Sequence, residues 1–96
     1  MLKIKKIIEI TDFVIICEFN NGLKKKLNVS PLIENHKHLN GIEKLQNNMI
    51  FKQVAIGDMG EIYWKNIITS KSNELWNYDI SPEFIFYNGI AIDLKS

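Results

Sequence analysis

Few residues of this sequence could do acid–base or metal chemistry, and two of them are histidines separated by one residue. His36 and His38 are its only histidines, and Glu34 precedes His36 by two positions. On a helix, residues two apart project about 200° apart, so the imidazoles could share one ion only in an extended segment. Two imidazoles and one carboxylate still fall short of the four ligands of a structural zinc site. We therefore expect solvated histidines in a loop and no bound metal or cofactor.

Cys17 and a short acidic loop are the other groups with reactive or ligating side chains. Cys17 lies within the apolar run FVIICEF, whereas a nucleophilic thiol needs a neighbouring base and a partly open site. The loop GDMGE contains Asp58 and Glu61, but the alternating oxygen ligands of a calcium-binding loop are absent. There is no phosphate-binding glycine loop and no Gly-x-Ser-x-Gly turn. The sequence therefore predicts no catalytic residues and no enzyme activity.

The composition indicates one small domain covering residues 1–96. A chain of 96 residues with 46% hydrophobic content can bury a core of its own. Lysines and acids nearly balance to a net charge of +1, which gives no long-range field toward nucleic acid or anionic lipid. The single cysteine indicates a reducing compartment, and no apolar run reaches the length of a signal peptide or membrane span. We expect a soluble cytoplasmic protein without a membrane partner.

Alternation of apolar and polar residues predicts two N-terminal strands. Residues 2–10 alternate as a half-buried strand does, except that Lys6 and Ile7 break the pattern. Residues 13–19 are apolar on both faces, which is typical of a central strand. Thr11 and Asp12 are predicted to form the turn between these strands.

A third strand should return antiparallel to the second. The Asn-Gly pair at residues 21–22 is a strong hairpin signal, because both central residues of a type I′ turn need positive φ. Residues 23–29 would then place Leu27 toward the core, with Lys24 and Lys26 toward water.

Two Ser-Pro phrases predict the starts of helices. A serine at the N-cap accepts from free amides of the first turn, and proline suits the first helical position because it lacks an N–H. Ser30 with Pro31 would start one helix. Ser81 with Pro82 would start another, which Gly89 would end after residue 87.

The remaining segments complete an expected order of β-β-β-α-β-β-α. Residues 51–56 and 61–64 are predicted as strands joined by a glycine-containing loop, and residues 41–47 as a short helical turn. Residues 65–78 receive no assignment. A competing interpretation makes residues 84–93 a hairpin about Asn88-Gly89. The expected fold class is α+β, an antiparallel sheet of about five strands with short helices packed on it.

Three stretches of the sequence match the pattern of a known family. They are FNNGLKKKLNVSPLIE, FKQVAIGDMGEIYWKN and DISPEFI, and the matching positions include Phe19, Gly22, Val29, Pro31, Leu32, Phe51, Val54, Gly60, Ile62, Trp64 and Asn66. On these residues the chain resembles the small bacterial domains called domain of unknown function 2442 (DUF2442). It departs from their pattern at Asn28, at Lys65, and in about a dozen extra residues between Asn66 and Asp79.

The resemblance implies an α+β domain on an antiparallel sheet, with no catalytic residue set. It also implies a gene that neighbours another small uncharacterised protein, in a toxin-antitoxin-like pair. The family likeness therefore points to binding of a protein partner.

Two groups of side chains are candidates for a partner surface. Lys24 to Lys26, with Lys3 and Lys5, could form a basic sheet face for phosphates, although lysines also protect strand edges and the chain has no arginine for reading bases. The C-terminal third is rich in aromatic residues, which serve either in the core or at interfaces. The predicted partner-binding residues are Tyr63, Trp76, Tyr78, Tyr87, Lys24 and Lys26.

These observations together predict a non-catalytic binding module whose partner is another small protein. The alternative is a regulatory protein that binds a small molecule or nucleic acid through the lysine-rich strand. A homodimer formed through an open sheet edge also stays possible.

Overall fold

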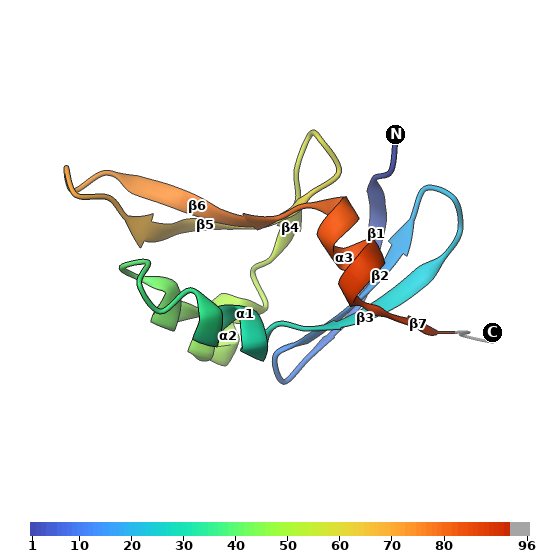
Figure 1. Ribbon diagram of the computed structural model, residues 1–96, viewed down its shortest axis with the longest axis horizontal. Coiled ribbons are helices and arrows are strands. Elements are labelled where there is room, and N and C mark those ends of the chain that lie inside the picture. The colour runs from blue at the N-terminus through green and yellow to red at the C-terminus, as the bar shows by residue number, and fades with distance from the viewer. Residues whose placement is uncertain (93–96) are drawn as a thin grey trace.

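The computed structural model describes residues 1–92 and shows an α+β protein with two antiparallel sheets (Figure 1). Sheet A has the strand order β1-β2-β3-β7, and sheet B has the order β4-β5-β6. The strands are β1 (Ile4–Thr11), β2 (Val14–Phe19), β3 (Lys24–Asn28), β4 (Ala55–Ile56), β5 (Ile62–Thr69), β6 (Leu75–Ile80) and β7 (Ile90–Ile92). The helices are α1 (Ser30–Asn35), the 3₁₀ helix η1 (Ile42–Gln46), α2 (Asn48–Phe51) and α3 (Pro82–Asn88).

The predicted fold class is confirmed, and the strands are divided between two sheets where one was expected. In Figure 1 the hairpin of β5 and β6 reaches away from sheet A and passes over the segment that contains η1 and α2. Strands β6 and β7 add to the five expected strands.

The broken alternation in β1 corresponds to two irregularities in its pairing with β2. Register shifts fall between Ile4 and Lys6 and between Ile7 and Glu9. Each shift is the signature of a β-bulge, which adds one residue to one strand. Residues Ile4, Ile7 and Ile10 thereby lie opposite Phe19, Cys17 and Ile15, the three fully buried residues of β2.

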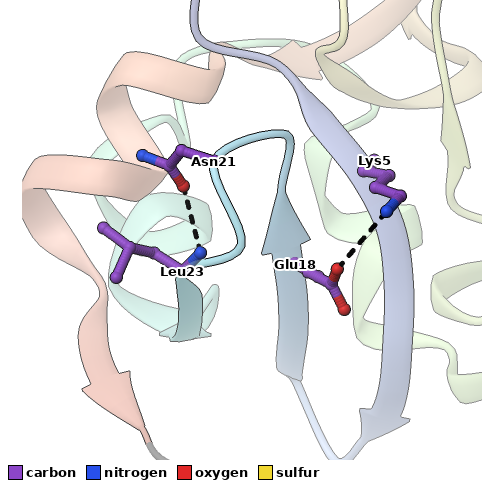
Figure 2. A network of polar contacts seen from close by, with 4 residues as sticks. All are labelled: Lys5, Glu18, Asn21 and Leu23. Carbon is purple, nitrogen blue, oxygen red and sulfur yellow. Dashed lines mark hydrogen bonds and ion pairs between the residues drawn. The ribbon is translucent and has the colours of Figure 1, made fainter.

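The hairpin between β2 and β3 is present, but the predicted type I′ turn is wrong. Of the two turn residues Asn21 and Gly22, only Gly22 has a positive φ, of 88°. The N–H of Gly22 donates to the carbonyl of Phe19 over 2.9 Å, and the N–H of Phe19 donates to Leu23 over 2.8 Å. A three-residue loop that ends in a left-handed glycine has these bonds. The Asn21 Oδ1 atom accepts from the Leu23 N–H over 3.0 Å and closes the loop (Figure 2).

The turn between β1 and β2 also differs from the prediction by one residue. Thr11 lies opposite Val14, so the turn consists of Asp12 and Phe13. Phe13 has a φ of 60°, and its carbonyl accepts from the Val29 N–H over 2.7 Å. This bond connects the turn to the start of α1.

One of the two predicted serine caps is confirmed. The Ser81 Oγ accepts from the Phe84 N–H over 3.1 Å, and α3 ends at Gly89, whose N–H donates to the Ile85 carbonyl over 2.8 Å. The helix interpretation of this segment is therefore correct. The chain then forms strand β7, and Asp93 of the competing hairpin lies outside the described residues.

The predicted cap at Ser30 is wrong. Val29 already has helical dihedral angles, and its carbonyl accepts from Leu32 and Ile33. The helix therefore begins one residue before the position that the Ser-Pro phrase predicts. Asn28 provides the local side-chain bond instead, since its Oδ1 accepts from the Ser30 N–H over 3.1 Å.

The predicted strand at 51–56 is mostly wrong, because a helix occupies its beginning. Asn47 caps α2, with its Oδ1 accepting from Met49 and Ile50, so Phe51 ends a helix and the strand begins only at Ala55. A capping asparagine thus determines the local structure here, in competition with the strand propensity of the residues that follow.

Buried residues of both sheets and of the helices form one hydrophobic cluster. Trp64 of β5 packs against Phe51 of α2 with ring centroids 5.5 Å apart, and Phe51 meets Phe13 at 5.6 Å. Phe19 of β2 meets Phe86 of α3 at 5.6 Å. The aromatic side chains therefore connect sheet B to the helices and the helices to sheet A.

Candidate interaction surface

Cys17 lies in the core and is fully buried in the middle of β2. Its burial raises the pKa of the thiol to about 12. The thiol therefore stays protonated at neutral pH, and thiols in this form are poor nucleophiles.

His36 forms a polar contact with Tyr78 across the fold. The His36 Nδ1 lies 2.8 Å from the Tyr78 hydroxyl, and the His36 and His38 rings form a T-shaped pair with centroids 5.9 Å apart. Burial, and secondly the charge of Asp79, raise the pKa of Tyr78. Within residues 1–92, no three His, Cys, Asp or Glu side chains lie close enough together to hold a metal ion. His36 therefore has a structural contact at the end of α1, in place of the solvated loop position expected for it.

The lysine-rich strand does not extend into a uniformly basic face. Strand β2 separates β3 from β1, so Lys3 and Lys5 are not on the neighbouring strand of Lys24. Glu18 of β2 lies opposite Lys24, and its carboxylate is 3.8 Å from the Lys5 ammonium (Figure 2). Lys24 and Lys26 thus lie on a face of mixed charge.

Lys25 is turned to the opposite face of β3. Its ammonium lies 4.9 Å from the centroid of the Phe86 ring, which is within cation–π range. Lys25 therefore packs beneath α3 and is not part of the outer face.

The four aromatic candidates differ in exposure. Tyr78 is only 7% exposed and belongs to the core, and Tyr63 is half-buried. Trp76 and Tyr87 are 59% and 79% exposed. The structure therefore leaves two of the four as freely accessible aromatic side chains.

Leu75 is an exposed apolar residue that sequence reasoning did not select. It precedes Trp76 in β6 and is 54% exposed. Successive strand residues point to opposite faces, so the two side chains extend from the two sides of β6. The alternation of Trp76, Tyr78 and Ile80 with polar Asn77 and Asp79 was the available signal for this strand.

Strand β6 is an edge of sheet B. Within the described residues it pairs with β5 alone. Its sequence, LWNYDI, contains neither of the two residues, lysine and proline, that commonly protect edge strands. The outer edge of β6 is therefore available for pairing with another strand.

The outer face of sheet B next to this edge is hollowed and acidic. A depression of about 460 Å³ is lined by Asp58, Glu61 and Asp79, with Tyr63 and Lys65 beside them. The Glu61 carboxylate accepts from the Met59 N–H over 3.0 Å, which holds the β4–β5 loop. Negative charge therefore surrounds the end of β6 that leads into α3.

Comparisons with known proteins give this chain no relative. No family model, no curated protein and no solved structure matches it. The resemblance to the DUF2442 family therefore stays a prediction. Among residues 1–92, no helix has the length and apolar character needed to cross a membrane.

Proposed function

We propose that this protein is a non-catalytic binding module that recruits another protein through the free edge of β6. The main observation in support of this proposal is that the Trp76 side chain is exposed on that edge strand. Tryptophan is among the residues that contribute most to protein interfaces, because it buries a large rigid surface.

The partner would add a strand to sheet B. An unpaired edge offers a row of backbone N–H and C=O groups, and a partner's extended segment satisfies them while its side chains meet those of the edge. Leu75 and Trp76 project on the two sides of β6, so their side chains would contact an added strand on both of its faces.

Charge favours a basic partner segment. Glu74 precedes the strand, Asp79 lies near its end, and both are exposed. Asp58 and Glu61 extend the same sign over the neighbouring loop. Lysines or arginines beside the added strand would meet these carboxylates, which speeds association and rejects acidic competitors.

The proposed partner is the product of the neighbouring gene, in a toxin-antitoxin-like pair, and the proposed compartment is the cytoplasm. The DUF2442 resemblance suggests the gene pair. The free thiol of Cys17 suits a reducing compartment.

Nucleic-acid binding by the lysine strand is a weaker alternative. Glu18 lies opposite Lys24, and Glu9 is in the same cross-strand row as Lys26. These carboxylates would face the phosphates that the lysines attract.

Co-expression of the protein with the neighbouring gene product tests the proposal. We expect the two to co-elute from a size-exclusion column, and Trp76→Ala to weaken the complex by about thirtyfold, the effect of losing a hot-spot side chain. Tyr87→Ala is the matched control, since it removes another exposed aromatic ring, on α3. Separate elution of the unmodified proteins, or equal effects of the two variants, would reject the β6 edge as the docking site.

A further inference from the structure

A second depression lies between α1 and α3, where β7 stops covering β3. Strand β7 pairs with β3 only over Lys24 to Lys26, because the chain turns into β7 at Gly89 and Ile90. Asn28 lies past the end of this pairing. The resulting hollow has a volume of about 330 Å³, which is within the range of small-molecule sites.

The walls of this hollow are apolar, with amide side chains around them. Leu27, Leu32 and Phe84 contribute the apolar surface. Asn28 uses its Oδ1 atom to accept from the Ser30 N–H, so its Nδ2 group remains a potential donor to a ligand. The hollow can therefore hold an apolar body and donate hydrogen bonds at its rim.

Among the residues that the structure describes, Lys26 is the only charged one that lines the hollow. Neither of the ion pairs found within residues 1–92 includes it. Its neighbours on β3 differ, since Lys24 lies opposite Glu18 and Lys25 packs over Phe86. Glu9 is in the same cross-strand row, but Ile16 of β2 lies between it and Lys26, so Lys26 has no ion-pair partner among the described residues. An ammonium group without such a partner favours a negatively charged ligand.

We propose that this hollow binds a small organic carboxylate with an apolar chain or ring. Its carboxylate would contact Lys26 and the Asn28 amide, while its apolar body would pack between Leu32 and Phe84. Protein docking on β6 uses other residues, so either activity can be lost without the other.

The probe for this site is decanoate, kept below its micelle concentration, with decan-1-ol as the uncharged control of equal chain length. Binding to the full chain is followed by amide chemical shifts in two-dimensional NMR. We expect decanoate to shift the amide signals of residues 26–28, Leu32 and Phe84. Decanol should bind at least about fivefold more weakly than decanoate. Equal binding of the two probes, shifts confined to other residues, or no shifts would overturn the proposal.

Two lysine variants provide a matched pair. Lys26→Gln should weaken decanoate binding about fivefold and leave decanol binding unchanged, whereas Lys24→Gln on the same strand should change neither. Both residues are on the solvent side of β3, so both variants are expected to fold. Equal weakening by the two variants would show a general charge effect and contradict a site at Lys26. Tighter binding of a peptide with a free carboxyl end than of decanoate would contradict a small-molecule ligand.

Discussion

The indole N–H of Trp64 donates a hydrogen bond to the backbone carbonyl of Phe51 over 2.8 Å, and both side chains are buried. This bond connects β5 to the last residue of α2, at the place where a strand was predicted and a helix is found. It holds sheet B, and with it the β6 edge, against the helices.

Replacing this donor should destabilise the fold. Trp64→Phe removes the shorter of the two hydrogen bonds that the Phe51 carbonyl accepts, leaving only the bond from the Val54 N–H over 3.4 Å, and opens a cavity beside it. The free energy of unfolding should therefore fall by about 2–4 kcal/mol. Urea unfolding of the variant and of the unmodified protein measures this difference in free energy. Trp76→Phe is the control on the exposed tryptophan and should change stability by no more than about 0.5 kcal/mol. Similar losses in the two variants would contradict the buried role of Trp64.

Gly41 should tolerate substitution far less than Gly22. Both have positive φ, but a Cβ at Gly41 would run into the backbone carbonyl of Ile67 in β5, whereas one at Gly22 meets open space. Gly22→Ala should cost about 1 kcal/mol for the left-handed backbone alone, and Gly41→Ala at least about 3 kcal/mol. Urea unfolding of the two variants gives the comparison. Equal costs would mean that the loop before η1 is not packed against β5.

Cys17 should react with thiol reagents only after unfolding. Its buried thiol has a pKa of about 12, raised from 9.0. The unfolded chain therefore loses this proton at lower pH than the folded chain, and the stability that Cys17 contributes is complete below pH 9.0 and is lost as pH rises toward 12. Urea unfolding across this range should show a smaller decline for Cys17→Ala than for the natural sequence. Rapid labelling of the folded protein at pH 8 would contradict this account.

Tyr78 should ionise late in an alkaline titration. Burial and the nearby charge of Asp79 raise its pKa, so absorbance of phenolate should show a step above the ordinary tyrosine range. Tyr78→Phe should remove this step, and Tyr87→Phe should retain it. A titration of Tyr78→Phe that matches the unmodified protein would place Tyr78 in solvent.

The sequence predicted the elements whose signals are local. Ser81, Pro82 and Gly89 each act within one turn of α3, and their prediction is confirmed. The hairpin of β2 and β3 was also predicted, but its turn type was not. The hydrogen bonds that Phe19 makes with Gly22 and Leu23 close a three-residue loop.

Features that depend on distant residues could not be read from the sequence. Strand β7 joins sheet A by pairing with β3 across more than sixty residues of chain. The hydroxyl of the buried Tyr78 contacts His36, which lies 42 positions away. The exposure of Trp76 follows from its position where the hairpin extends past the core, and its spacing alone does not distinguish it from Tyr78.

Tryptophan fluorescence in the presence of the neighbouring gene product tests the proposed β6 interface most directly. Trp64 is 1% exposed and Trp76 is 59% exposed, so a spectral change on binding would report Trp76. We expect the partner to shift the emission of the protein to shorter wavelength, and the shift to be absent in Trp76→Phe. A complex that forms with no shift, or with the same shift in Trp76→Phe, would show that the partner does not cover the edge of β6.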